Sequence, residues 1–262
     1  MNHFKTAIQS GKTQLGTWMM TGSETVAEAM AGVGFDFLVL DQEHVAVDTL
    51  DAIRIDRAIR SVGQVTPLYR LAWNDTVLIK RALDGGAMSV MVPFIENAEQ
   101  AQKAVEAAYY PPLGKRGFAA VHRASQYGHQ TDFVRAARED LCLILQLETP
   151  EAIDQIEAIA AIEGVSGLFI GPGDLSAAMG HIGNPSHPDV QAKIKQGLAQ
   201  CQALGIPCGI VGGNPDLVNK YQQWGFSFVA LGSDMSMLMA RAKEQLAAIR
   251  GESITVSGGE VY

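Results

Sequence analysis

The chain has 262 residues, of which 47% are hydrophobic and 18% are charged, and its formal net charge is −8. This composition can build a large core and excludes a disordered protein, while the negative charge argues against nucleic acid or an anionic membrane as the main partner. No apolar run approaches the roughly 20 residues that span a bilayer, so we expect no membrane partner.

Short β-rich runs alternate with helical patterns along the whole chain. Most of these runs are continuously apolar, as expected of parallel strands that are buried on both faces. The eight predicted strands are 15–20, 37–41, 66–71, 88–93, 141–147, 167–171, 207–211 and 227–231.

The segments between the strands carry helix signals. Residues 97–109 repeat small apolar side chains every three or four positions, and Asn97 is placed to cap the first turn. Thr149 and Asn214 each precede a proline that suits the first helical position. Glycines follow several helices where a left-handed residue is expected, at Gly34, Gly63, Gly164, Gly205 and Gly225.

Eight βα units in one domain-sized chain predict an α/β fold of the closed (β/α)8, or TIM-barrel, type over residues 1–250. A doubly wound sheet is the alternative, but eight parallel strands and the lack of GxGxxG after the first strand count against it. The insertion 110–140 is too long for a simple connection, which suggests a functional role. Residues 251–262 are predicted to form a flexible tail.

Cysteine usage and the start of the chain bear on location. The three cysteines, Cys142, Cys201 and Cys208, show neither metal-binding nor redox spacing, and their odd number suits reduced thiols. The first eleven residues contain no apolar region of a signal peptide. We therefore expect a cytoplasmic protein.

Polar side chains gather at the predicted strand ends. In a (β/α)8 barrel the active site lies at the carboxyl ends of the strands. The residues found there are Trp18, Asp41, Glu43, His44, Arg70, Gln146, Glu148 and Asp174. Charged groups inside apolar runs are costly unless they are paired or bind metal, so the cluster favours a functional site over isolated structural ion pairs.

Glu148 and Asp174 follow neighbouring predicted strands, so their carboxylates should share a proton or bind a cation. Oxygen donors without cysteine or multi-histidine spacing favour Mg²⁺ or Mn²⁺. An acid/base pair, as in glycosidases, is the alternative, although Arg70 nearby suits a planar carboxylate or a developing oxyanion. No lysine lies in a predicted strand, which counts against a Schiff-base mechanism.

Five short motifs occur in order along the chain. They are DQEH at 41–44, RLAWND at 70–75, YPPLGKRG at 110–117, QLETPEA at 146–152 and GPGDLS at 171–176. Together they resemble the HpcH/HpaI aldolase family over nearly the whole chain. The resemblance implies a metal-dependent class II pyruvate aldolase, a carbon–carbon lyase. Such an enzyme reversibly cleaves 4-hydroxy-2-keto acids into pyruvate, or a related 2-keto acid, and an aldehyde.

The resemblance also implies roles for individual residues. Glu148 and Asp174 would bind the divalent cation, with Co²⁺ as a further candidate beside Mg²⁺ and Mn²⁺. Arg70 would contact the keto oxygen and stabilise the enolate. His44, oriented by Asp41, would transfer protons.

Other residues are expected to complete the site. Gln146 and Glu43 would support the ligand-bearing side chains, with Gln146 also near the substrate. The backbone around Gly173 and Asp174 would bind the substrate carboxylate, and Trp18 would form a wall of the pocket.

The resemblance further implies a homo-oligomer, a hexamer built as a trimer of dimers, with the C-terminal helix exchanged between subunits. Two segments differ from the family pattern, FAAVH at 118–122 and VGGN at 211–214, and they leave the acceptor aldehyde open. The remaining histidines, among them His181 and His187, are interpreted as residues of surface loops or subunit interfaces.

Two alternatives stay open. Decarboxylation of oxaloacetate, or another carbon–carbon cleavage, needs the same stabilised pyruvate enolate. A binding barrel without activity would not need Arg70, His44, Glu148 and Asp174 together.

Overall fold

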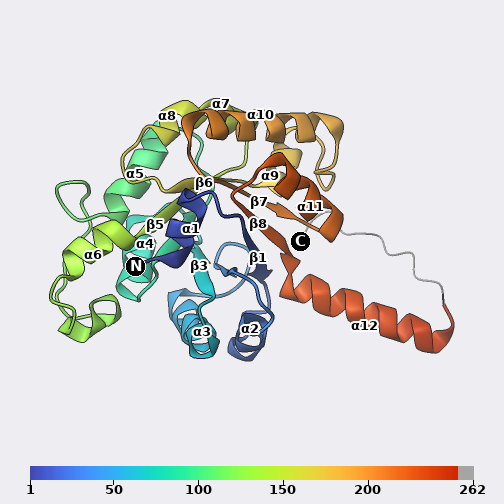
Figure 1. The fold of residues 1–262 in the computed structure, drawn as a ribbon, viewed down its shortest axis with the longest axis horizontal. Coiled ribbons are helices and arrows are strands. Elements are labelled where there is room, and N and C mark those ends of the chain that lie inside the picture. Colours follow the sequence, from blue (N-terminus) through green and yellow to red (C-terminus); the bar gives the residue numbers. More distant parts are fainter. Residues whose placement is uncertain (253–262) are drawn as a thin grey trace.

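The computed structural model describes residues 1–252, and within them eight parallel strands close into a barrel in chain order (Figure 1). The strands are β1 (Gln14–Met19), β2 (Phe37–Asp41), β3 (Thr66–Arg70), β4 (Ser89–Val92), β5 (Cys142–Leu147), β6 (Gly167–Ile170), β7 (Cys208–Gly212) and β8 (Phe228–Ser233). Every predicted strand is present, and the predicted (β/α)8 barrel is confirmed.

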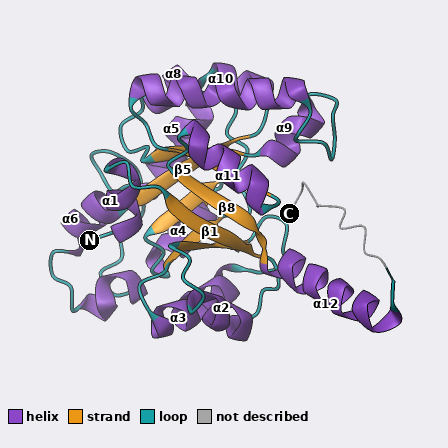
Figure 2. Ribbon diagram, turned by 45° about the vertical axis from the view of Figure 1, so that its right-hand side comes forward, coloured by secondary structure: helices purple, strands orange, loops and turns teal. Residues whose placement is uncertain are grey.

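The chain also forms helical segments, most of which surround the strands on the outside of the barrel (Figure 2). They are α1 (His3–Gln9), α2 (Glu24–Ala31), α3 (Thr49–Val62), α4 (Thr76–Asp84), α5 (Ala98–Ala108), the 3-10 turn η1 (Arg123–Gly128), α6 (Phe133–Asp140), α7 (Pro150–Asp154), α8 (Ile156–Ala160), α9 (Pro172–Ala178), α10 (Pro188–Leu204), α11 (Pro215–Trp224) and α12 (Asp234–Arg250).

The predicted capping residues account for where several helices begin and end. Asn97, Thr149 and Asn214 each accept a hydrogen bond from a backbone N–H in the first turn of the following helix. Gly205 is left-handed at the end of α10, as predicted (φ 68°). The prediction for Gly63 is wrong, because this residue is extended (φ 176°) and needs no special freedom.

Alternate residues of each strand face the barrel interior, and this alternation sets the position of the polar residues. In β2, Phe37 and Val39 belong to the interior cluster, whereas Leu38 and Leu40 pack in the outer core against the helices. The next interior position in β2 is Asp41. The same two-residue period makes Arg70 an interior residue, because it lies two positions after Leu68 of the interior cluster. In β5 the period likewise places Gln146 and Glu148 on the interior side after Ile144.

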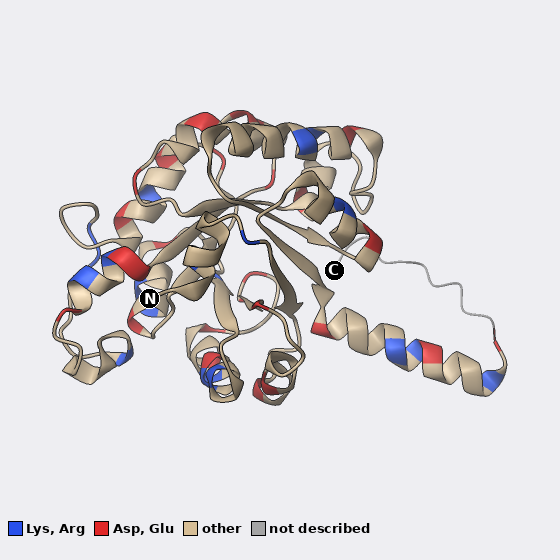
Figure 3. Cartoon of the chain, in the orientation of Figure 1, with Lys and Arg blue, Asp and Glu red and all other residues tan. Residues whose placement is uncertain are grey.

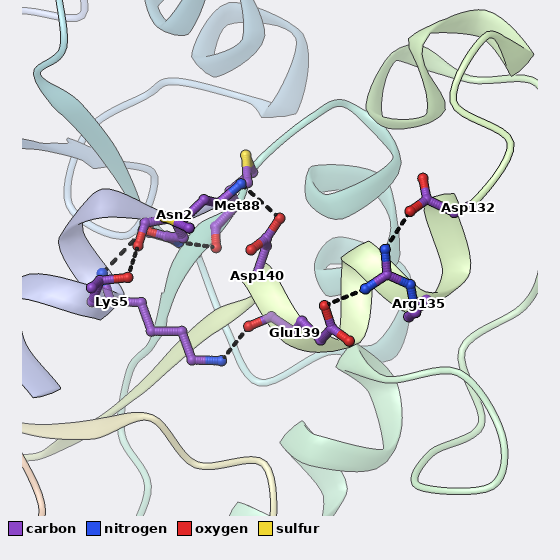
Figure 4. Close-up of polar contacts among 10 residues, drawn as sticks. Asn2, Lys5, Met88, Asp132, Arg135, Glu139 and Asp140 are labelled. Atoms are coloured by element: carbon purple, nitrogen blue, oxygen red, sulfur yellow. Dashed lines mark hydrogen bonds and ion pairs between the residues drawn. The ribbon is translucent and has the colours of Figure 1, made fainter.

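Helix α1 closes the amino-terminal end of the barrel. The ring of Phe4 lies 5.2 Å from Phe37 and 5.4 Å from Phe228, which are the first residues of β2 and β8. Asn2 donates a hydrogen bond to the carbonyl of Met88, and Lys5 donates one to the carbonyl of Glu139 in α6 (Figure 4). The amino-terminal end of the barrel is therefore sealed, and the active site is expected at the carboxyl ends of the strands.

The insertion 110–140 packs against that sealed end. Arg123 pairs with Asp56 and donates to the carbonyl of Gly85, which precedes β4. A cavity of about 460 Å³ beside the insertion is bordered by Met88 and Leu141, the residues directly before β4 and β5. Within one chain, the insertion thus lies far from the carboxyl ends of the strands, and its functional role stays a prediction.

Helix α12 projects away from the barrel (Figures 1 and 2) and carries charges of both signs (Figure 3). Along it, Leu238 and Ile249 are 58% and 84% exposed. Gly251 caps the helix in the left-handed conformation, and the rest of the predicted tail, 253–262, lies outside the described residues. No helix within residues 1–252 combines the length and apolar character needed to cross a bilayer.

Candidate active site

Arg70 lies at the centre of the carboxyl end of the barrel and is fully buried. Its Nε and Nη2 donate to the two oxygens of Asp41, at 2.9 and 2.6 Å, and its Nη1 lies 3.1 Å from Oε2 of Glu43. The two strands place Asp41 and Arg70 opposite each other in register, so both side chains point inward at one level. The planar guanidinium is therefore fixed in one orientation.

Trp18 lies beneath this ion pair. The Cζ atom of Arg70 is 4.1 Å from the centre of the indole ring, and Trp18 in turn meets Phe169 edge to face at 6.1 Å. Trp18 has no exposed surface in the chain. Trp18 thus makes a cation–π contact with Arg70, while a direct contact with substrate stays a prediction.

Glu148 follows β5 and is only 2% exposed. Its Oε1 accepts a hydrogen bond of 2.6 Å from Nε2 of Gln146, and its Oε2 accepts one of 3.1 Å from the backbone N–H of Phe94. A Cβ atom at Gly171 would overlap Oε1 of Glu148. Two hydrogen bonds hold the carboxylate, and glycine at position 171 leaves room for it.

Phe94 is a residue that sequence reasoning missed. It follows β4 with φ 54°, in the left-handed region that a residue with a side chain rarely adopts. That conformation directs its N–H to Glu148, and its ring stacks on Trp73 at 6.1 Å. No residue type signals a backbone donor, so the sequence contained no sign of it.

Asp174 lies in the first turn of α9, directly after β6. It is partly exposed, and its charge acts on both Glu148 and Glu43. The N-cap residue of α9 is Gly171, which has no side chain to accept a hydrogen bond. The backbone N–H groups of the first turn, among them those of Gly173 and Asp174, therefore have no side-chain cap. The structure therefore brings Asp174 and Glu148 together at the carboxyl end of the barrel, which is called the mouth below.

His44 stands at the rim, with half of its side chain exposed. Its ring nitrogen Nε2 lies 3.9 Å from Glu43, whereas the hydrogen bond between His44 and Asp41 comes from the backbone N–H of His44 and not from its ring. The sequence-based expectation that Asp41 orients the imidazole therefore has no support in this geometry. Asp41 orients Arg70, and the carboxylate nearest to the ring is that of Glu43.

The charges at this mouth do not balance. Asp41, Glu43, Glu148 and Asp174 supply four carboxylates around the one guanidinium of Arg70. Burial, followed by the negative charges of Glu43 and Asp174, raises the pKa of Glu148 to about 8. Burial likewise raises the pKa of Glu43, although Arg70 opposes the shift.

The donor set fits a hard divalent cation. Carboxylate oxygens are the ligands such cations prefer, and the excess negative charge favours one here. Oε1 of Gln146 is buried and has no hydrogen-bond partner among the described residues, so one further neutral oxygen is available.

Comparison with known proteins identifies the family of the chain. The sequence pattern of the HpcH/HpaI aldolase/citrate lyase family matches residues 14–240. The 2-dehydro-3,6-dideoxy-6-sulfogluconate aldolase of Pseudomonas putida is 52% identical over 248 residues, 95% of this chain and 97% of the relative. The 4-hydroxy-2-oxo-heptane-1,7-dioate aldolase of Shigella flexneri is 42% identical over 257 residues, 98% and 96% of the two chains.

Solved structures share the fold. A family protein from Burkholderia cenocepacia J2315 superposes with a TM-score of 0.92 at 34% identity and covers 95% of this chain and 100% of its own. The chain belongs to the HpcH/HpaI aldolase/citrate lyase family. It is an aldolase, and the predicted carbon–carbon lyase is confirmed.

Proposed function

We propose that this aldolase depends on a divalent cation and reversibly cleaves a 4-hydroxy-2-keto acid into pyruvate, or a related 2-keto acid, and an aldehyde. The observation that carries the proposal is the convergence of four carboxylates around one fixed guanidinium at the barrel mouth. Oxygen donors favour Mg²⁺ or Mn²⁺, with Co²⁺ as a weaker candidate.

Glu148 and Asp174 would hold the cation. Gln146 and the N–H of Phe94 keep the carboxylate of Glu148 in place, which reduces the cost of ordering it for binding. When bound, such a cation polarises the keto acid and lowers the energy of its enolate. The remaining chemistry belongs to residues of the chain.

In the cleavage direction, His44 accepts the proton of the C4 hydroxyl. The C3–C4 bond breaks, its electron pair enters the enolate of pyruvate, and the aldehyde departs. Arg70 faces the negative oxygen of the enolate, while Asp41 and Trp18 keep the guanidinium in place. Protonation at C3 then gives pyruvate, and the N–H groups at Gly173 and Asp174 would bind its carboxylate.

The names of the two relatives suggest the kind of acceptor. Both named substrates are 2-oxo acids with a second acidic group at the far end, a sulfonate in one and a carboxylate in the other. Cleavage between C3 and C4 leaves that group on the aldehyde. We therefore expect this chain to prefer a short aldehyde with an anionic end, over a neutral aldehyde of equal length.

The exposed apolar residues of α12 support an exchange of this helix between subunits. Leu238, Met239 and Ile249 lie on a helix that leaves the barrel, and a second copy would bury them. This surface supports the pairing of two chains, and we propose from the family resemblance that three such dimers form a hexamer. Light scattering of the wild type should give six chains, and Leu238→Glu together with Ile249→Glu should give smaller species.

The decisive experiment measures pyruvate release from a 4-hydroxy-2-keto acid before and after exhaustive chelation. We expect activity to disappear and to return with Mg²⁺ or Mn²⁺. Glu148→Gln should lose it by several orders of magnitude, whereas the matched control Glu151→Gln, on the exposed side of α7, should not. Activity that survives chelation, or a lysine adduct trapped by borohydride, would overturn the proposal. Oxaloacetate, assayed in parallel, tests the decarboxylase alternative through relative kcat/KM.

A further inference from the structure

A second group of side chains that could bind a metal lies outside the mouth, on the loop between α9 and α10 and in the first turn of α10. It consists of His181, His187 and Asp189, whose ligand atoms all lie within 4.8 Å of one another. The imidazole rings of His181 and His187 stack nearly parallel, with centres 3.5 Å apart and planes 14° apart. Oδ2 of Asp189 is 3.7 Å from a nitrogen of each ring.

Hydrogen bonds between these side chains do not explain the arrangement. A nitrogen–oxygen distance of 3.7 Å is longer than a hydrogen bond, so Asp189 holds neither ring directly. The ring of His187 has one backbone partner, the N–H of Asp189, at a long 3.3 Å. The two imidazoles are therefore in contact through ring stacking, and no short hydrogen bond joins either ring to the carboxylate of Asp189.

The loop backbone keeps the three residues in place. The N–H of His181 donates to the carbonyl of Ser176 at 2.7 Å, and the N–H of His187 donates to the carbonyl of Asn184 at 3.1 Å. The buried Gln191 donates to the carbonyl of Pro185 at 2.8 Å. The loop backbone is thus braced from both helices, so binding an ion requires the side chains to reorient but does not require the loop to become ordered.

The ligand set selects a different class of metal from that of the mouth. Two imidazole nitrogens and one carboxylate suit Zn²⁺, Ni²⁺, Co²⁺ or Cu²⁺, whereas the oxygen donors around Glu148 suit Mg²⁺ or Mn²⁺. A metal–nitrogen bond of about 2.0–2.1 Å lies in the plane of the imidazole, so the two stacked rings must rotate apart before both can bind one ion. The ligand atoms, which lie within 4.8 Å of one another, must then come to about 3.3 Å apart. The side chains are 28%, 31% and 71% exposed, so they can move that far and an ion can enter.

We propose that His181, His187 and Asp189 form a second metal site, which takes a divalent transition metal with Zn²⁺-like preferences. Water fills the positions that the protein leaves open. The site is structural, since it links the end of α9 to the start of α10. Helix α9 carries Asp174 in its first turn, so the bound ion braces the helix that supplies one carboxylate of the mouth.

The test uses full-length protein without a histidine tag and titrates it with ZnCl₂ in a calorimeter. Glu148→Gln removes a carboxylate of the mouth and should leave one Zn²⁺ site per chain. Adding His181→Ala in that background should weaken this site by more than about tenfold, or 1.4 kcal/mol. His181 is the better choice than His187, because the ring of His187 also caps α10. His3→Ala, another exposed histidine, is the matched control and should change nothing.

A second measurement does not depend on activity or on the mouth. Electron paramagnetic resonance of the Glu148→Gln protein with one equivalent of Cu²⁺ should show hyperfine coupling to imidazole nitrogen, and Asp189→Asn should alter the signal. His181→Ala should abolish the two-nitrogen pattern. Equal Zn²⁺ binding in the presence and absence of His181, or a Cu²⁺ spectrum with oxygen ligands alone, would refute the site. Neither result would affect the proposed aldolase mechanism, which chelation and Glu148→Gln test separately.

Discussion

Asp41 and Arg70 are register partners on β2 and β3, and two hydrogen bonds of 2.9 and 2.6 Å join them in the buried centre of the barrel mouth. The pairing fixes the plane of the guanidinium before any substrate arrives. A preorganised donor of this kind stabilises developing charge without reorganising during the reaction. The hydrogen bond that Asp41 accepts from His44 comes from the backbone N–H and not from the ring, and both relationships can be tested.

Arg70→Lys should lower kcat by about 10²–10³-fold, because an ammonium group cannot match both oxygens of Asp41 or keep the planar contact with Trp18. Steady-state kinetics of aldol cleavage measure the effect. Arg57→Lys, on the exposed face of α3, is the control and should behave as wild type. Near-normal turnover in Arg70→Lys would show that the fixed guanidinium is unnecessary.

Asp41→Asn should reduce the free energy of unfolding by about 3–5 kcal/mol, since it leaves a buried guanidinium without its main partner. It should also lower kcat while keeping the wild-type shape of the pH–rate profile, because Asp41 acts through Arg70. Thermal unfolding and a pH series of kcat measure the two effects. A profile of changed shape would instead indicate that Asp41 acts on His44.

Metal affinity should rise with pH, because burial holds the pKa of Glu148 at about 8 and the cation needs the ionised carboxylate. Between pH 6 and 8, Kd for Mg²⁺ should tighten by about tenfold per pH unit as one proton leaves, and it should level off above pH 8. Calorimetry in buffers of different ionisation enthalpy counts the released proton. An affinity independent of pH over this range would contradict the prediction.

The same pKa governs the stability of the metal-free protein. The folded pKa of Glu148 lies above the ordinary value of 4.5, so its protonated form stabilises the fold fully below about pH 4.5. That contribution is lost as the pH rises to 8. Glu148→Gln should therefore flatten the pH dependence of unfolding in this window.

Gly171→Ala should weaken metal binding by at least about tenfold, because the added methyl group overlaps Oε1 of Glu148 and displaces the carboxylate. Gly63→Ala is the matched control, since its backbone is extended and no atom lies within 4 Å of the added Cβ. Calorimetric titration with Mn²⁺ compares the two variants. Equal affinities would mean that Glu148 does not hold the ion.

Phe94→Gly should be more stable than Phe94→Ala by about 1 kcal/mol, because both lose the ring but only glycine adopts φ 54° without strain. Chemical denaturation measures the difference. If Phe94→Ala proved equally stable, the backbone at residue 94 would carry no strain, and directing its N–H toward Glu148 would require no free energy.

The amino-acid sequence by itself determined the barrel, its strands and the residues at the strand ends. These features follow from periodicity and from local order along the chain, since apolar runs, caps and strand lengths are properties of neighbouring residues. The polar positions were visible because a charge inside an apolar run, such as Arg70 or Glu148, stands out in the sequence.

Only the tertiary structure decided which of these side chains meet. The partner of Asp41 is Arg70 rather than His44, the N–H of Phe94 supports Glu148, and His181 stacks on His187. Each relationship depends on strand register, on a backbone angle or on the path of a loop. Such quantities are set by packing between distant segments, and no local pattern of residue types encodes them.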